Sequence, residues 1–144
     1  MDFVLRPNEP GDRDLFFESR REGFRAYAEQ AFGPWDDPKQ RASAETDFDE
    51  LPIEIIERDG SRVGCQIILP EGDHVFLDEI VVVAGVRSHG LGTRLVTAIM
   101  DATHAQGLPL RLSVLNVNPA QRLYERLGFR VTRVEPPRIK MEWP

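Results

Sequence analysis

The chain has 144 residues, of which 41% are hydrophobic, and 18 Lys and Arg against 24 Asp and Glu give it a formal charge of −6. This length predicts one domain, residues 1–144, that buries about two thirds of the surface of its extended chain. The acidic balance argues against a sequence-independent grip on nucleic acid, which needs a basic face. It suits a cationic acceptor, or it simply aids solubility.

The single cysteine, Cys65, excludes an internal disulfide and any metal site built from several cysteines. It lies between Val63 and Ile67 and is interpreted as a small core residue. The sequence shows no charged-then-apolar leader, no apolar run of membrane-spanning length and no lipidation motif. We therefore expect a soluble cytoplasmic protein without a membrane partner.

The first segment predicts a strand followed by a helix. Phe3–Arg6 forms the strand, which Pro7 ends, and either Asp12 or Asp14 can accept from the first helical N–H groups. The helix carries an apolar stripe at Phe17, Phe24, Ala28 and Ala31. Gly33-Pro34 is expected to end it.

A second helix is predicted over Asp37–Phe48, because Asp36 or Asp37 can cap it and Pro38 suits its first turn. Tyr27 and Trp35 lie close to the connection between the two helices. Aromatic residues at such positions belong either to the core or to a substrate pocket.

The middle of the chain predicts antiparallel strands. Ile53–Arg58 and Arg62–Leu69 are rich in β-branched residues and are joined by Asp59-Gly60, a strong hairpin signal. Pro70–Asp73 makes a second turn into His74–Val83. This last segment is apolar on both alternating faces at its end, which predicts a central strand covered on both sides.

The stretch Val81–Arg94, VVVAGVRSHGLGTR, passes from that strand through a glycine-rich turn into a helix. Gly90 and Gly92 keep side chains away from the first helical turn, whose N–H groups are unpaired and carry partial positive charge. Arg87 and Arg94 add cationic charge on either side. The stretch therefore predicts an anion cradle, although an ordinary strand-to-helix connection has the same outline.

The remaining elements alternate between helices and strands. The helix after the turn has a stripe of Leu91, Leu95, Ile99 and Ala102. It stops at Gly107, and Leu110–Leu115 is the next strand. A short helix that ends at Gly128 has a stripe of Ala120, Leu123, Tyr124 and Leu127. Val131–Glu135 and Arg138–Glu142 predict a terminal hairpin across two prolines.

Two motifs carry a family resemblance. RSHGLG, residues 87–92, resembles the R/Q-x-x-G-x-G/A signature of the GNAT superfamily of N-acetyltransferases. NPAQRLYERLGF, residues 118–129, is similar to the second half of that family's acyl-CoA site, and the resemblance runs from roughly Ile53 to Val134. It implies an α/β fold with a mixed, mainly antiparallel sheet flanked by helices. A third stretch, YAEQAFGPWDDPKQ, is similar to a YVEQ-x-WGWDE-x-x-Q pattern of a bacterial subgroup whose acceptors are mostly unassigned, although Pro34 shifts its register.

The resemblance implies transfer of an acetyl group from acetyl-CoA to a primary amine of a small molecule or peptide, without a covalent enzyme intermediate. The residues that it implies for acetyl-CoA binding are Ile80, Val81, Val82, Arg87, Ser88, His89, Gly90, Leu91, Gly92, Thr93, Asn118 and Tyr124. The family's commoner spacing is N-x-x-A-x-x-L-Y, one residue longer than here. The residue that meets the pantetheine arm is therefore either Asn116 or Asn118, and Asn118 is also a natural helix cap before Pro119.

Two residues are implied to act in the chemistry. Tyr124 resembles the family's general acid by its place in the second motif. A phenol with a reference pKa of about 10 is suited to that role, because it can donate to a thiolate whose parent thiol titrates near 8.5. The alternative is a tyrosine packed in the core. Glu79 occupies the position from which some relatives draw a general base through water, and otherwise it is a solvated carboxylate or an ion-pair partner. Asp78 is expected on the opposite face of the strand, and Tyr27 and Trp35 are the candidate acceptor contacts.

One rival function is a non-catalytic acyl-CoA-binding or sensor module. Another is a nucleotide-binding protein, but the glycine-rich turn of this sequence lacks the G-x-x-x-x-G-K-S/T spacing that such a protein would need. The histidines, including His74 and His104, have no metal-ligand partner at useful spacing, so no metal is expected. A monomer or a homodimer is equally compatible with the sequence.

Overall fold

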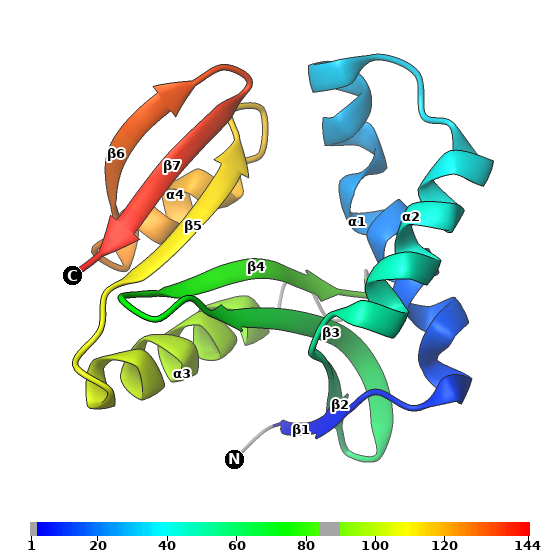
Figure 1. Ribbon diagram of the computed structural model, residues 1–144, viewed down its shortest axis with the longest axis horizontal. Coiled ribbons are helices and arrows are strands. Elements are labelled where there is room, and N and C mark those ends of the chain that lie inside the picture. The colour runs from blue at the N-terminus through cyan, green and yellow to red at the C-terminus, as the bar shows by residue number, and fades with distance from the viewer. Residues whose placement is uncertain (1–2, 84–89) are drawn as a thin grey trace. The chain divides into compact units, whose positions relative to one another are not determined.

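The computed structural model describes residues 3–83 and 90–144. Its elements are β1 (Val4–Pro7), the 3-10 turn η1 (Pro10–Asp12), α1 (Arg13–Phe32), α2 (Asp37–Glu50), β2 (Ile53–Arg58), β3 (Ser61–Pro70), β4 (Val75–Val82), α3 (Leu91–Ala105), β5 (Leu110–Leu115), α4 (Ala120–Arg126), β6 (Arg130–Glu135) and β7 (Arg138–Trp143) (Figure 1). Every predicted strand and helix is present, with bounds that differ by one or two residues. None of the helices in this described part combines the length and hydrophobicity that a membrane crossing requires.

The strands hydrogen-bond in the order β1-β2-β3-β4-β5-β7-β6, so β4 is the central strand of seven. β4 pairs parallel with β5, whereas β1 with β2, β2 with β3, β5 with β7 and β6 with β7 pair antiparallel. The predicted α/β class with a mixed, mainly antiparallel sheet is confirmed.

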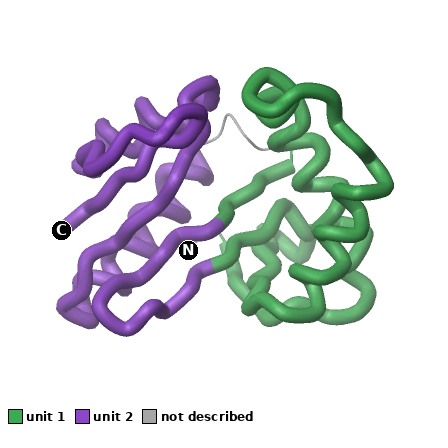
Figure 2. The backbone as a smooth tube through the Cα atoms, turned by 45° about the horizontal axis from the view of Figure 1, so that its top comes forward, with its two compact units in different colours: residues 1–67, 79–89 green, residues 68–78, 90–144 purple. Residues whose placement is uncertain are grey.

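The chain forms two compact units (Figure 2). Unit 1 comprises the described parts of residues 1–67 and 79–89, and unit 2 comprises residues 68–78 and 90–144. β3 and β4 each contribute residues to both units.

In unit 1, the apolar face of α1 differs from the predicted stripe. Phe16 and Phe17 are buried, but Phe24, Ala28 and Ala31 are only half-buried. The buried surface of this helix therefore lies in its first two turns, and the prediction of a stripe along its whole length is wrong. Arg20 and Arg41 place their guanidinium groups over the rings of Phe16 and Phe17, at 4.3 Å from each centroid.

The helix ends in unit 1 show which capping predictions hold. α1 ends at Gly33 with φ 98°, and the Asp36 carboxylate accepts from the N–H of Lys39 at 3.1 Å to open α2. Asp12 occupies the N-cap position of α1 but makes no side-chain cap bond, because its carboxylate instead accepts from the N–H of Glu9 at 2.8 Å within η1. Asp14 lies inside the first turn of α1.

The β2–β3 hairpin forms as predicted. Asp59 and Gly60 both have positive φ, 52° and 79°, as a type I′ turn requires. Further along β3, a Cβ built on Gly64 would lie 2.1 Å from the carbonyl oxygen of Val81 on β4. Glycine is therefore required where these two strands approach each other. Cys65, next to it, is fully buried as expected.

In unit 2, α3 buries Leu91, Leu95 and Ile99 as predicted, but Ala102 is exposed. Thr103 takes the inner position instead, and its hydroxyl donates to the carbonyl of Ile99 at 2.7 Å. This bond satisfies the buried hydroxyl within its own helix, which makes an inward threonine tolerable.

The prediction that β4 is covered on both faces is only half right. Val75, Leu77 and Val81 are buried, whereas Phe76, Ile80 and Val82 on the alternate face are half-buried. At the far edge of the sheet, β6 is exposed along its whole length, as befits an edge strand.

Candidate functional site

The residues predicted to bind acetyl-CoA fall on the end of β4 and the start of α3. Ile80, Val81 and Val82 are the last three residues of β4. Gly90 precedes α3, and Leu91, Gly92 and Thr93 form its first turn. Arg87, Ser88 and His89 lie outside the described residues.

The first turn of α3 has backbone donors that the helix itself does not pair. Gly90 has φ 73°, a left-handed conformation that favours glycine, and the first intrahelical bond is donated by the N–H of Arg94 to the carbonyl of Gly90 at 3.2 Å. The N–H groups of Leu91, Gly92 and Thr93 precede that bond and have no acceptor within the helix. A Cβ built on Gly92 would meet no described atom within 4 Å. Three donors without an acceptor in the helix suit the binding of an anion, and no described atom occupies the space beside Gly92.

The second half of the site is built on α4. The Asn118 side-chain oxygen accepts from the N–H of Ala120 at 2.9 Å, so Asn118 does act as the local cap that the sequence allowed. Its side-chain NH2 group still has two hydrogens to donate to a ligand. Asn116 is exposed, at the end of β5.

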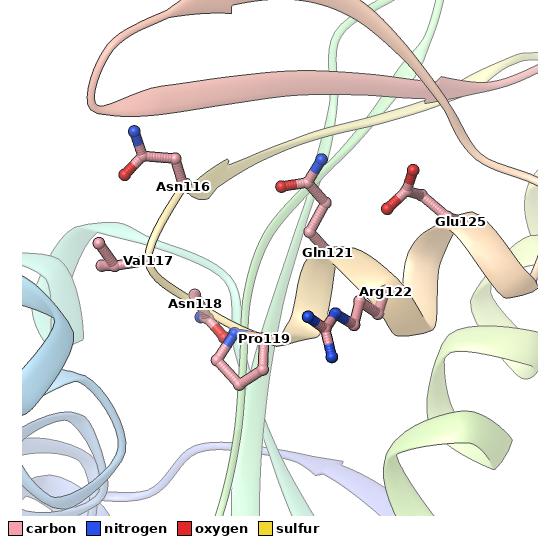
Figure 3. A pocket seen from close by; sticks show the side chains of 7 residues that line it. All are labelled: Asn116, Val117, Asn118, Pro119, Gln121, Arg122 and Glu125. Atoms are coloured by element: carbon pink, nitrogen blue, oxygen red, sulfur yellow. The ribbon is translucent and has the colours of Figure 1, made fainter.

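A polar pocket of about 460 Å³ lies beside this helix, lined by residues that include Asn116, Asn118, Pro119, Gln121, Arg122 and Glu125 (Figure 3). Both candidate asparagines line it, so it does not distinguish between them. Figure 3 shows Gln121, Arg122 and Glu125 projecting from α4. The sequence analysis missed these three, although their positions three, four and seven residues after Asn118 mark one face of a helix.

Tyr124 is not among the residues that line this pocket. It is half-buried, and its ring meets that of Phe129 edge-on with centroids 5.6 Å apart. Burial raises the pKa of its hydroxyl. Within residues 3–83 and 90–144 this hydroxyl makes no hydrogen bond. Tyr124 thus combines core packing with a hydroxyl that stays protonated and is available as a donor.

Glu79 is an ion-pair partner, one of the alternatives left open by the sequence. The Nε atom of Arg20 donates to both of its carboxylate oxygens, at 3.0 and 3.1 Å, and Arg20 also binds Asp47 at 2.7 Å. Burial lowers the pKa of Arg20, but the charge and hydrogen bonds of Glu79 and then those of Asp47 outweigh it, so the pKa is raised overall. Asp78, the preceding residue, was expected on the opposite face of the strand, and it is exposed.

The sequence did not reveal Arg20 as the partner of Glu79, because 59 residues separate them. Cys65 is close enough to this pair to feel both charges. Burial, followed by the charge of Glu79, raises the pKa of its thiol to about 12, so it is an inert core residue.

The candidate acceptor contacts Tyr27 and Trp35 are both half-buried in unit 1. The Trp35 indole N–H donates to the Asp37 carboxylate at 2.8 Å, which holds the ring against the start of α2. Among the described residues, no three His, Cys, Asp or Glu side chains are grouped so that they could hold a metal ion.

The sequence profile of the Acetyltransferase (GNAT) family matches residues 16–129. Among solved structures, the PaiA N-acetyltransferase of Thermoplasma acidophilum in complex with coenzyme A is similar, with a TM-score of 0.75 and 14% identity over 99% of this chain and 98% of that one. The ribosomal-protein-S18-alanine N-acetyltransferase of Escherichia coli has a TM-score of 0.70 and 20% identity over 99% and 93%.

The structure of the acetyltransferase YncA of Salmonella typhimurium with its cofactor acetyl-CoA is also similar, with a TM-score of 0.63 and 19% identity over 99% of this chain and 94% of that one. Among curated protein sequences, no significant match was found. These structural likenesses show the fold. The family profile covers well over half of the chain, and the matched residues include the start of α3 and Tyr124. The chain therefore belongs to the GNAT family of acetyltransferases.

Proposed function

We propose that the protein transfers an acetyl group from acetyl-CoA to a primary amine of a small molecule or peptide, by direct attack and without a covalent enzyme intermediate. Family membership supports acetyl transfer, and similar structures contain coenzyme A or acetyl-CoA. The oligomeric state, monomer or homodimer, and the cytoplasmic location of the protein remain predictions.

The observation that carries the proposal is the start of α3. Glycine in a helix costs about 1 kcal/mol relative to alanine. No described atom lies within 4 Å of a Cβ at Gly92, so packing against the described residues does not demand the glycine. A ligand close to the backbone explains it, and the pyrophosphate of coenzyme A is the anion that this family places there.

The proposed chemistry needs one proton donor. The amine nitrogen attacks the thioester carbonyl carbon, the C–S bond breaks, and the sulfur leaves with the electron pair. Tyr124 donates its proton to that thiolate, and its raised pKa keeps it protonated until it does so. The proton lost by the amine passes to water.

Glu79 is the proposed acceptor of that proton through water, with solvent as the alternative. Arg20 already donates to both oxygens of this carboxylate, so the role requires a water that reaches Glu79 beside Arg20. Tyr27 and Trp35 are the proposed acceptor contacts. A non-catalytic acyl-CoA-binding module is the second candidate, and it predicts binding without turnover.

Binding and turnover are tested separately. Coenzyme A at about 100 times its Kd should stabilise the fold by about 2.7 kcal/mol and raise Tm by roughly 5–10 °C. Gly92→Val should abolish this shift, whereas Gly92→Ala should reduce it only in part, because one methyl group intrudes less on a ligand near the backbone and the family signature accepts Gly or Ala at this position. Coenzyme A affinity in Gly92→Val equal to that of the wild type, by calorimetry, would contradict the assignment of the α3 start.

Turnover is then measured with acetyl-CoA against amines, amino acids, polyamines, aminoglycosides and peptide N-termini, with free thiol as the signal. Thiol release with one acceptor class supports the enzyme. A Tm shift with coenzyme A but no thiol release with any class favours the binding module.

A further inference from the structure

A groove of about 700 Å³ lies on the open sheet face of unit 2, over β4, β5, β7 and β6. Four cationic side chains line it against a single carboxylate. We call it the cationic groove and define it by Arg111, Ser113, Arg133, Arg138, Lys140 and Glu142. Its charge is opposite to the net charge of −6 on the whole chain. An excess of one charge in a hollow marks a binding surface for the opposite charge.

The strand register arranges these side chains in rows across the sheet. Arg111 pairs with Glu142, and two residues along, Ser113 pairs with Lys140, which in turn pairs with Arg133. Arg138 belongs to a third row, between Leu115 on β5 and Glu135 on β6. The alternate residues Leu112 and Met141 are buried, so the charged rows occupy the open face.

The carboxylates present do not balance the cations. Glu142 binds Arg111 at 2.7 Å and lies 3.9 Å from Arg130, while Glu135 is shared by Arg133 at 2.8 Å and Lys140 at 3.4 Å. The side chains of Arg133 and Lys140 remain 70% and 50% exposed. Ion pairs this exposed are weak and can be exchanged for a ligand carboxylate.

The floor of the groove contains a hydroxyl that lacks a partner. The Ser113 Oγ atom is buried and makes no hydrogen bond within the described residues. A buried hydroxyl without a partner is costly, and polar groups left unsatisfied are often completed by a bound molecule.

The spacing of the rows decides the shape of the ligand. Residues two apart on a strand lie about 6.8 Å apart, so the three rows span about 13 Å instead of converging on one point. An extended peptide has alternate side chains at the same spacing. A compact anion such as phosphate would meet the cations of one row at a time.

We propose that the cationic groove binds an extended acidic peptide segment whose alternate Asp or Glu side chains lie over these rows. The proposal concerns binding alone and does not rest on acetyl transfer.

The test uses the intact protein and a fluorescein-labelled hexapeptide of alternating Ser and Glu, with fluorescence anisotropy as the signal and no acetyl-CoA present. The double variant R133A/K140A should raise Kd by about fivefold to tenfold, since each exposed charge pair contributes up to about 1 kcal/mol. Arg25→Ala removes an equally exposed cation from α1, 52% exposed, and should leave Kd unchanged. Thermal unfolding of each variant verifies the fold.

Wild-type binding should weaken with rising salt, and the same peptide with Gln in place of Glu should not bind. Unchanged affinity in R133A/K140A, or an equal loss in Arg25→Ala, would overturn the proposal. So would competition by inorganic phosphate or by a single-stranded oligonucleotide at equal charge concentration, because either would show a general anion site. These results are independent of the coenzyme A tests at Gly92.

Discussion

The Asp12 side chain accepts several hydrogen bonds at once. Its carboxylate is 2% exposed and accepts twice from Arg6, at 2.8 and 3.1 Å, once from the N–H of Glu9 and once from Arg62 at 3.1 Å. Through these bonds it ties β1, η1 and β3 together. The hydrogen bond from Arg6 is the main reason that its pKa falls to about 2, against the opposing effect of burial.

This lowered pKa predicts how stability depends on pH. A carboxylate with a depressed pKa stabilises the fold above its unfolded pKa of about 3.9, and the contribution is lost as pH falls towards 2. Asp12→Asn should therefore lower the free energy of unfolding by about 1 to 2 kcal/mol at pH 7, a modest amount because the arginine partners are partly exposed. The loss should become progressively smaller below pH 4, where the wild-type carboxylate is itself protonated. Urea unfolding across this range measures it. Asp14→Asn is the matched control, since its side chain is 87% exposed, and a similar loss there would refute the assignment.

Tyr124 is the residue where packing and chemistry can be separated. Tyr124→Phe keeps the ring against Phe129 and removes only the hydroxyl, which has no partner among the described residues. Tm and coenzyme A affinity should hardly change, while turnover falls by roughly 10²-fold, the usual contribution of general acid catalysis. The assay is steady-state thiol release at saturating acceptor.

The pH profile adds a second readout. Because burial raises the pKa of Tyr124, the wild-type rate should hold to higher pH than an ordinary phenol allows before it declines. Near-wild-type turnover in Tyr124→Phe would leave solvent as the proton source and return this residue to a packing role.

At the scale of elements, the approach of β3 to β4 restricts the sequence most strongly. β2 and β3 shift register near Ile56 and Glu57, and the N–H of Val83 donates to the carbonyl of Val63 at 2.8 Å. Gly64 lies at this irregularity, against the carbonyl oxygen of Val81. The end of β4, which leads to the glycine-rich turn, is held in place there.

Gly64→Ala should therefore destabilise the protein. Its Cβ would lie 2.1 Å from a backbone oxygen that has no flexible end to move away, so the free energy of unfolding should fall by about 3 kcal/mol or more. Gly11→Ala is the control, because a Cβ there meets no described atom within 4 Å. Chemical denaturation of both variants checks this, and equal stabilities would show that the strands separate without cost.

At the scale of the molecule, neither unit is one continuous segment. Unit 1 includes residues 79–89 in addition to its N-terminal part, and unit 2 includes residues 68–78, which lie between the two parts of unit 1 in the sequence. β3 and β4 run from one unit into the other, and all seven strands belong to one hydrogen-bonded order. We propose on this basis that residues 1–144 behave as a single domain.

A single domain predicts one cooperative unfolding transition. The calorimetric and van't Hoff enthalpies should agree, and near-UV and far-UV circular dichroism should change together. Two separated transitions, or an enthalpy ratio well above one, would instead show that the units unfold independently. Adding coenzyme A should move the whole transition and leave its shape unchanged.

Much of the fold could be predicted from the sequence, because the signals that set local structure act over a few residues. The type I′ turn at Asp59-Gly60, the end of α1 at Gly33 and the cap of α2 at Asp36 all follow from backbone preferences and short hydrogen bonds. The family motifs likewise identified the start of α3 and Tyr124 as candidate site residues.

Other features depended on contacts between residues far apart in the chain. Arg20 binds Glu79, which is 59 residues away in the sequence. The Asp12 carboxylate accepts from Arg62, 50 residues away, and makes no side-chain cap bond to α1. The cationic groove exists only because the register of β5, β7 and β6 aligns Arg111, Lys140 and Arg133 on one face. Local periodicity determines which side of an element is apolar, but strand order and register determine which side chains meet, and these depend on packing of the whole chain.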